Sequence, residues 1–254
     1  MTDNTYQSTL EISNTPKIEK LISEDRLNEA LSLICDETCD DLNLMGIIFT
    51  RQSKFDEAIR CFDKALAIED SDEIKLNKTN ALYKYAKISF FPDGDYEKAL
   101  NLINIALDMT DENEDEFYFL KAEILESIGD LKNSHKYYLM AHGEFERLKE
   151  FERQTEYLEN TDDILINITG NYFYDFTPSD GLIVDLKIES DNEHDPDAIA
   201  VFLDGVKIGY VANSDYTVMD GASGASDIKN KINNNSKSEI LFVYLDKVVG
   251  KVII

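Results

Sequence analysis

The sequence predicts an α + β protein of two domains, with an N-terminal α-helical solenoid followed by a small β-barrel-like domain. Three observations carry this prediction. Small and large apolar residues recur at fixed spacings through the first two thirds of the chain. From about residue 164, apolar and polar residues alternate, which is typical of half-buried strands. The pair Asp204-Gly205 lies between two such segments, where a two-residue hairpin turn is expected.

Composition sets limits on the class of protein. The chain has 254 residues, enough for two modest domains at roughly 100–200 residues each. Hydrophobic residues make up 43%, so a packed core is expected. The formal net charge is −26, and such a field repels phosphate backbones at long range. This charge disfavours a sequence-blind nucleic-acid binder that acts through charge alone.

The chain shows no targeting or metal-binding pattern. Its first residues are polar and lack the apolar segment of a signal peptide, and no stretch approaches the ~18 apolar residues of a membrane span. Cys35, Cys39 and Cys61 are an odd count, and no His or further Cys stands near them at zinc spacing. We expect a cytoplasmic protein with reduced thiols, no metal, no cofactor and no membrane contact.

The helical repeat is clearest between Asp41 and Asp70. Gly46 precedes Ala58 by twelve positions, and the large residue Phe62 and the small residue Ala65 follow at intervals of four and three. Two antiparallel helices approach closely only where small residues face each other, and large residues fill the space between layers. Each helix pair leaves an apolar face uncovered, so the pairs are expected to stack.

The same spacings return later in the chain. Ala122, Ser134, Tyr138 and Ala141 reproduce them. Between these units, Ala99, Ile103 and Ala106 reproduce only the second-helix half. The stretch "ISFFPDG", which lies between Tyr85 and Asp95, precedes this second helix. It is expected to lengthen the connection between the two helices of the middle unit.

The ends of the helical region follow from weaker signals. An earlier unit has Ala30 at the small position, and residues 144–160 suggest a closing helix with a charged outer face. The predicted division is therefore a flexible N-terminus over residues 1–16, helical repeats with a capping helix over 17–160, and a β domain over 165–254.

These helical segments resemble tetratricopeptide repeats, whose period is about 34 residues. The resemblance implies a concave groove, lined by the first helices, that binds an extended peptide of a protein partner. By register this groove is expected to include Asn43, Ile47, Thr50, Lys78, Leu82, Tyr85, Phe119, Glu123 and Glu126. The residues with which one version of the family clamps a C-terminal carboxylate are absent, so a basic or apolar peptide is expected. A solenoid that serves as a spacer or as a dimer surface is the alternative.

The last third is expected to form six short strands. The candidates are Ile164–Thr169, Leu182–Glu189, Ala198–Leu203, Lys207–Val211, Glu239–Leu245 and Val248–Ile254. The pair Asp246-Lys247 is a weaker hairpin signal than the Asp-Gly turn. The stretch from Asn213 to Ile232 interrupts the strands and is expected to hold one or two short helices.

The acidic stretch before the hairpin admits several interpretations. As a calcium loop it fails, because Pro196 stands where glycine is needed and Phe202 where the ligating Glu is needed. No serine or cysteine nucleophile is paired by spacing with His194. Asn192 and Asp195 suit a loop in which side chains cap backbone amides. A structural turn and one edge of a binding site both stay open.

The β region resembles the HIRAN domain. The resemblance rests on Gly170 with Tyr172 to Tyr174, then the set N-x-x-D-P-x-A-I-x-V from Asn192, then the strand Ile208-Gly209-Tyr210-Val211. It covers about ninety residues. HIRAN domains of remodelling proteins bind the 3′ end of single-stranded DNA, so the resemblance implies a nucleic-acid-binding surface. Its candidates are Tyr172, Phe173, Tyr174, His194, Asp195, Tyr210 and Asn213.

Within this implied site, Phe173 and Tyr174 would stack on bases, while Asp195 would accept a hydrogen bond from the terminal 3′-hydroxyl. Stacking contributes on the order of 1–3 kcal/mol per base. Two positions depart from the family, because Tyr172 and Asn213 stand where the DNA-end binders carry basic residues. From Leu165 onward, 14 acidic residues face 7 lysines. The site's shape is expected to be kept and its attraction for phosphate weakened.

The sequence therefore predicts a non-catalytic adaptor. Its repeats would hold a protein partner, and its β domain would engage a single-stranded nucleic-acid end. The alternative is a pure protein-interaction scaffold that does not bind nucleic acid. No nucleotide-binding motif or paired catalytic residues indicate an enzyme.

Overall fold

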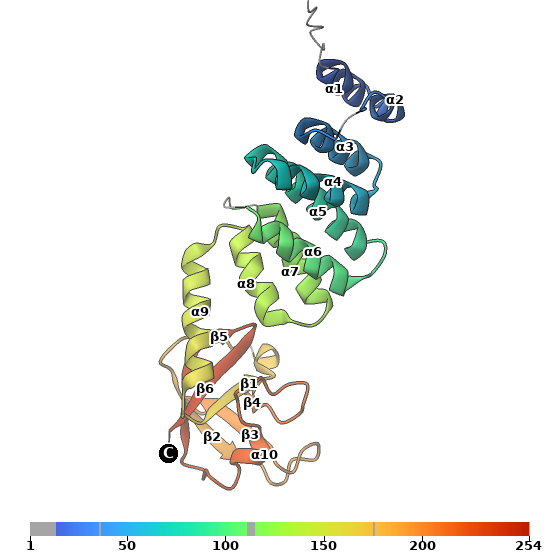
Figure 1. The fold of residues 1–254 in the computed structure, drawn as a ribbon. Coiled ribbons are helices and arrows are strands. Elements are labelled where there is room, and N and C mark those ends of the chain that lie inside the picture. Colours follow the sequence, from blue (N-terminus) through green and yellow to red (C-terminus); the bar gives the residue numbers. More distant parts are fainter. Residues whose placement is uncertain (1–13, 36, 111–114, 175, 254) are drawn as a thin grey trace, which may run out of the picture. The chain divides into compact units, whose positions relative to one another are not determined.

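A computed structural model of the chain describes residues 14–253 apart from 36, 111–114 and 175. The chain divides into two compact units at Gly143, a helical unit and a β-barrel unit (Figure 1). This α + β arrangement is the predicted fold class. Of the predicted flexible segment 1–16, residues 1–13 lie outside the described residues. The first helix begins at Thr15, before the predicted end of this segment. Within the described residues, no helix is long and apolar enough to cross a membrane.

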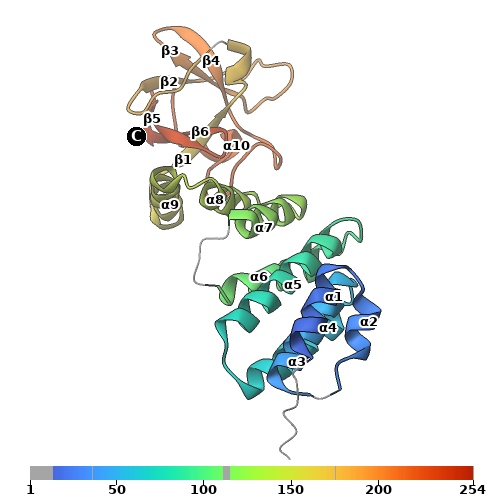
Figure 2. The ribbon, with the colours of Figure 1, turned by 90° about the horizontal axis from the view of Figure 1, so that it is seen from above.

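The helical unit is built from consecutive antiparallel helix pairs (Figures 1 and 2). Its helices are α1 (Thr15–Ser23), α2 (Leu27–Ser32), α3 (Cys39–Arg51), α4 (Phe55–Ile68), α5 (Asp72–Phe90), α6 (Tyr96–Asp108), α7 (Asp115–Ser127) and α8 (Leu131–Ala141). Each odd-numbered helix makes its most extensive contacts with the helix that follows it. The repeat predicted from residue spacing therefore has a structural counterpart in this pairing.

Gly46 explains the small-residue spacing in physical terms. A Cβ atom built at Gly46 would lie 2.5 Å from Cε1 of Phe62, whose side chain is fully buried between α3 and α4. Ala58 and Ala65 are fully buried in the same apolar cluster. The absence of a side chain at position 46 is what allows the Phe62 ring to fill the space between the helices.

The middle helix pair differs from the prediction. Helix α5 continues to Phe90, so much of the stretch expected to be loop is helical, and only residues 91–95 connect α5 to α6. Ala86 is fully buried on α5 in one cluster with Ala99 and Ile103. Ala86 is therefore the small residue of this pair, thirteen positions before Ala99 rather than twelve. The extra residue shifts the register of α5 relative to the neighbouring first helices.

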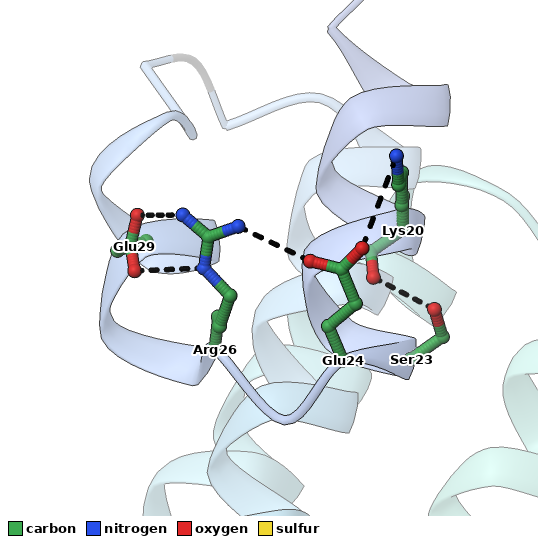
Figure 3. A network of polar contacts seen from close by, with 5 residues as sticks. All are labelled: Lys20, Ser23, Glu24, Arg26 and Glu29. Carbon is green, nitrogen blue, oxygen red and sulfur yellow. Dashed lines mark hydrogen bonds and ion pairs between the residues drawn. The ribbon is translucent and has the colours of Figure 1, made fainter.

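The turn between α1 and α2 is held by a group of charged side chains (Figure 3). The Arg26 guanidinium contacts both carboxylate oxygens of Glu29 and also reaches Glu24 Oε2 at 3.1 Å. Glu24 is 3.8 Å from Lys20 Nζ, and Ser23 Oγ donates to the Lys20 carbonyl at 2.7 Å. Because these groups are exposed, each pair contributes little stability and the group acts mainly on the local geometry of the turn.

The second unit is a closed barrel with the strand order β1-β4-β3-β2-β5-β6, all antiparallel. Its elements are α9 (Phe145–Asn160), β1 (Leu165–Thr169), the 3-10 helix η1 (Asn171–Tyr174), β2 (Ile183–Ile188), β3 (Ile199–Leu203), β4 (Val206–Val211), α10 (Ala225–Ile228), β5 (Lys237–Tyr244) and β6 (Lys247–Ile253). The six predicted strands are confirmed to within two residues at each end that the structure describes. The expected end of the last strand, Ile254, lies outside the described residues.

Two hairpin turns test the turn predictions. Asp204 and Gly205 have φ values of 50° and 81° and connect β3 to β4, as a two-residue turn with positive φ at both positions requires. Between β5 and β6 the turn residues are instead Leu245 and Asp246, with φ of 45° and 67°. The predicted pair Asp246-Lys247 was one residue late, because Lys247 pairs with Tyr244 in the sheet.

Helix α9 packs on the barrel. The Phe151 ring stacks on the Tyr244 ring with centroids 5.0 Å apart, and Thr155 Oγ1 lies 2.9 Å from the Tyr244 hydroxyl. The Tyr157 ring meets Phe242 edge-on at 6.1 Å. The sequence placed this helix with the repeats as their cap, whereas its contacts group it with the second unit, which begins at Glu144.

The barrel interior is apolar and includes the short helix α10. Its buried cluster joins side chains of β1 to β6, among them Ile166, Leu186 and Ile240, with Ala225 and Ile228 of α10. The segment between β4 and β5 therefore closes part of the barrel core. The predicted short helix in this segment is confirmed.

Candidate functional site

A cavity of about 500 Å³ lies on the barrel where β1 and β4 end near two loops. It is lined by Thr169, Asn192, His194, Asp195, Ala198, Tyr210, Val211, Asn213, Ser214 and Thr217. The structure thus brings together four of the predicted nucleic-acid-binding residues, namely His194, Asp195, Tyr210 and Asn213. His194 and Asn213 are distant in sequence, and the hairpin of β3 and β4 between them brings them together.

The loop before β3 is held by its own side chains. Asn192 Oδ1 accepts hydrogen bonds from the backbone amides of His194 and Asp195 at 3.0 and 3.1 Å. Asp195 Oδ1 accepts from the amide of Asp197 at 2.8 Å, and the Asp195 carbonyl accepts from Ala198 N at 3.1 Å. These bonds are the backbone capping that the sequence predicted for Asn192 and Asp195. They leave His194 exposed at the rim.

Asn213 ties this loop to the segment that carries α10. Its Nδ2 donates to Asp195 Oδ2 at 2.8 Å, while its Oδ1 accepts from the Ser226 amide at 2.8 Å. These two bonds fix the orientation of the Asn213 side-chain amide, because its nitrogen can only donate and its oxygen can only accept. Each Asp195 oxygen accepts one hydrogen bond, and a carboxylate has further lone pairs for a ligand donor.

Tyr210 is held by a charged pair, Lys207 and Glu189, that is not part of the cavity lining. Lys207 Nζ donates to Glu189 Oε1 at 2.6 Å and to the Tyr210 hydroxyl at 2.8 Å, and that hydroxyl donates to Glu189 Oε2 at 3.1 Å. These hydrogen bonds, led by the one from Lys207, hold the pKa of Glu189 below its usual value although burial opposes them. Burial and the neighbouring Tyr210 raise the pKa of Tyr174.

Sequence reasoning missed Glu189 and Lys207. In a regular strand, Lys207 and Tyr210 would point to opposite faces, since side chains alternate with a period of two. Between β3 and β4, however, Val201 pairs with Gly209 and Phe202 with Lys207, so β4 carries an extra residue. This bulge brings Lys207 and Tyr210 to one face. The one sequence signal for it is Gly209, because a glycine inside a strand pattern often marks a bulge or a close backbone approach.

The three predicted aromatic residues lie on η1. Tyr172 and Phe173 are 88% and 84% exposed, and their rings meet edge-on with centroids 5.9 Å apart. The nearly perpendicular rings offer two separate faces for stacking rather than one continuous platform. A Cβ at Gly209 would lie 2.6 Å from the Thr169 carbonyl oxygen. Gly209 therefore allows β4 to approach the end of β1, directly before η1.

The predicted peptide groove is only partly assembled. Asn43 is buried and bonds to α5, where Asn77 Nδ2 donates to Asn43 Oδ1 at 3.1 Å. Ile47 packs between two apolar clusters, and Thr50 Oγ1 donates to the Gly46 carbonyl at 2.8 Å. On α7, Phe119, Glu123 and Glu126 are exposed as the groove prediction requires.

The groove residues predicted on α5 are engaged inside the helix stack. Lys78 Nζ is 2.6 Å from Asp63 of α4, Leu82 is 2% exposed in the core, and the Tyr85 ring stacks on Phe55 at 5.0 Å. These three residues flank Ala81, which follows Gly46 by 35 positions, whereas the small residue of this pair is Ala86, five positions later. Counting from Gly46 therefore misplaced this part of the groove by five positions.

A cavity of about 340 Å³ between α5, α7 and α8 shows which α5 residues do lie on that face. Its lining includes Tyr83 and Lys87 of α5, Glu116, Phe119 and Glu123 of α7, and His142 after α8. The Tyr83 ring stacks on Phe117 at 4.6 Å. Burial and the Glu116 carboxylate raise the pKa of Tyr83. Tyr83 and Lys87 flank Ala86 as Phe119 and Glu123 flank Ala122, so counting from Ala86 rather than from Gly46 would have identified them.

The comparisons with known proteins give matches among solved structures. No family model and no curated protein matches the chain. Among solved structures, "Crystal structure of MamA" is 15% identical with a TM-score of 0.38, over 52% of this chain and 77% of that chain. "MamA RS-1 ArsTM double mutant" is 16% identical with a TM-score of 0.30, over 53% of this chain and 93% of that chain.

Proposed function

We propose that the chain is a non-catalytic adaptor whose helical unit binds an extended segment of a protein partner. The observation that supports this proposal is the open cavity between α5, α7 and α8. Phe119 is 42% exposed at this cavity, and the carboxylates of Glu116 and Glu123 and the Lys87 ammonium surround it. An exposed aromatic side chain among polar groups is a suitable anchor for a partner's side chain.

Selection of random displayed peptides on the full chain tests this function. Peptides that enrich are synthesised with a fluorophore, and their affinity is measured by anisotropy. Phe119→Ala is expected to weaken them by about tenfold or more, since anchor residues commonly contribute over 1 kcal/mol. Phe145→Ala removes another exposed phenylalanine, from α9, and is the matched control. Failure to enrich any peptide, or equal affinity of all three proteins, would contradict the proposal.

A second function is favoured by the convergence of His194, Asp195, Tyr210 and Asn213 on the barrel cavity. We propose that this cavity holds the end of a nucleic-acid single strand, as the resemblance to the HIRAN domain implies. Phe173 would stack on a base, and Asp195 would accept from the 3′-hydroxyl. A carboxylate accepts a hydrogen bond from a hydroxyl but repels a phosphate. The site would therefore prefer a strand that ends in a free 3′-hydroxyl to one that ends in a 3′-phosphate.

Anisotropy with oligonucleotides that end in a 3′-hydroxyl or a 3′-phosphate tests the second function. The hydroxyl form is expected to bind better, weakly, and with little loss on adding salt, because stacking is short-ranged while a basic binder would be strongly salt-dependent. Asp195→Ala should remove the discrimination and Phe173→Ala should lower affinity, while Phe119→Ala serves as the control. Equal binding of both ends, or none, leaves the adaptor as a pure protein-interaction scaffold.

A further inference from the structure

The helical unit has a second open cavity, of about 580 Å³, whose charge is opposite to that of the first. Its lining includes Arg51 of α3 and both Lys84 and Lys87 of α5, against a single carboxylate, Asp25. Three cationic side chains thus share one cavity in a chain whose formal net charge is −26. A positively charged cavity is not expected from so acidic a composition.

The fold accounts for only part of this grouping of cations. Arg51 Nη1 donates to the Ile22 carbonyl at 2.9 Å, and Lys87 Nζ lies 6.0 Å from the centroid of the Tyr83 ring. On the same helix, Lys75 and Lys78 pair with Asp70 and Asp63 at 2.5 and 2.6 Å. Within the part of the chain that the structure describes, Lys84 and Lys87 form no ion pair. Like charges close together on a helix are destabilising. An anionic group in the cavity would remove that cost.

The walls of the cavity are suited to part of a peptide chain. Phe55 and Ile88 supply apolar surface, and the hydroxyl side chains of Thr50 and Ser53 also line it. Acidic side chains, an adjacent apolar side chain and backbone groups would all find partners there. We therefore consider an acidic peptide segment rather than a free inorganic anion.

Lys87 lines both cavities, so the basic and the acidic one adjoin along α5. In the acidic cavity, Lys87 faces Asp115, Glu116 and Glu123. A uniformly acidic ligand would be repelled at α7, and a uniformly basic one would be repelled between α3 and α5. A ligand complements both cavities only if it carries negative charge at the basic cavity and positive charge at the acidic one.

We propose that the helical unit recognises a bipolar linear segment of its partner, with acidic side chains bound by Arg51, Lys84 and Lys87 and basic side chains bound by Glu116 and Glu123. This inference rests on the proposed peptide-binding function and narrows the class of partner. It replaces the basic or apolar peptide expected from the sequence with one that carries acidic and basic halves.

Three synthetic peptides test the proposal by anisotropy on the full chain. One has a block of Asp and Glu, a Leu-Phe spacer and a block of Lys and Arg, and the others keep the spacer with only one block. The bipolar peptide is expected to bind at least about tenfold more tightly than either half, because joined contacts act at high effective concentration. A peptide with the blocks exchanged controls for order along the chain and is expected to bind more weakly.

Charge reversals assign the halves to their cavities. Lys84→Glu should lower the affinity of the bipolar and acidic peptides and leave the basic one unchanged or tighter. Glu123→Lys should do the opposite. Arg60→Glu on α4 and Asp108→Lys on α6 make the same charge changes at exposed positions outside both cavities, and they are the matched controls. Circular dichroism checks that each variant is folded.

The outcomes separate the two proposals. If peptides enriched by display bind through Phe119 but the bipolar peptide binds no better than its halves, the bipolar inference fails and the adaptor function stands. If Arg60→Glu acts as strongly as Lys84→Glu, binding reflects net charge alone and the inference also fails. If no peptide of any kind binds, the adaptor function itself is overturned.

Discussion

The Phe151 ring lies parallel to the Tyr244 ring, with centroids 5.0 Å apart and planes inclined by 6°. This contact joins the middle of α9 to the last residue of β5. Phe151 is 6% exposed and Tyr244 is also 6% exposed, so both rings are removed from water by the pairing. The stability of the barrel unit is therefore expected to depend on a helix that precedes its first strand.

The first prediction concerns this helix. Phe151→Ala is expected to destabilise a fragment of residues 144–254 by about 3 kcal/mol, because it leaves a cavity beside Tyr244. Urea unfolding followed by circular dichroism measures the change. Phe145→Ala on the same helix, at a 51% exposed position, should change stability by less than about 0.5 kcal/mol. A fragment of residues 165–254 that is as stable as 144–254 would contradict the role of α9.

The second prediction concerns the contact between α3 and α4. Gly46→Ala gains about 1 kcal/mol of helix propensity but forces the buried Phe62 ring to move, which costs about 1–3 kcal/mol. We expect a net loss of stability in thermal and urea unfolding of the full chain. In a Phe62→Leu background, the same substitution should be neutral or stabilising. Equal effects in the two backgrounds would show that the Phe62 ring is not the obstacle.

The third prediction concerns the bond between Asn213 and Asp195. Asn213→Asp replaces the donor with a second carboxylate, and we expect a loss of about 1–3 kcal/mol at neutral pH in the 144–254 fragment. Two carboxylates would then face each other where a donor and an acceptor now pair. Urea unfolding of the fragment, followed by circular dichroism, measures the loss. Asn235→Asp, at an exposed loop position, should change stability by less than about 0.5 kcal/mol, and an equal loss in the two variants would contradict the role of the Asn213–Asp195 bond.

The fourth prediction concerns acid stability. Hydrogen bonds led by the one from Lys207 lower the folded-state pKa of Glu189, so the ionised form stabilises the fold above its unfolded pKa of about 4.3. This contribution is lost as pH falls through the folded pKa. Glu189→Gln is expected to be less stable than the natural chain at neutral pH and to lose less stability on acidification. Parallel pH profiles for the two proteins would exclude this role for Glu189.

Local patterns predicted the elements well. The alternation from residue 164 located six strands, and Asp204-Gly205 located a turn, because each signal depends on neighbours in sequence. Features that depend on distant neighbours were not predicted. The apolar side of α9 suits a repeat cap and a barrel support equally, and only the contacts of Phe151, Thr155 and Tyr157 separate them.

The candidate sites show the same limit. The resemblance in the β region named four residues that do share a cavity, since the motif and its hairpin are contiguous in sequence. The bulge that adds Lys207 to the site was missed. In the helical unit, counting from Gly46 instead of from Ala86 placed Lys78, Leu82 and Tyr85 on the groove in place of Tyr83 and Lys87, an error of five positions. A register error of this kind changes the predicted charge of a whole face.

Closure of the barrel has a consequence for how the second unit can meet other molecules. Each of its six described strands has a hydrogen-bonded neighbour on both sides, although β1 and β4 share only two residue pairs. No described strand therefore leaves its whole edge free, and the addition of a peptide as a further full strand, or association of two copies edge to edge, would require the barrel to open. Recognition by this unit is therefore left to side chains and loops, where single substitutions can alter it without disturbing the sheet.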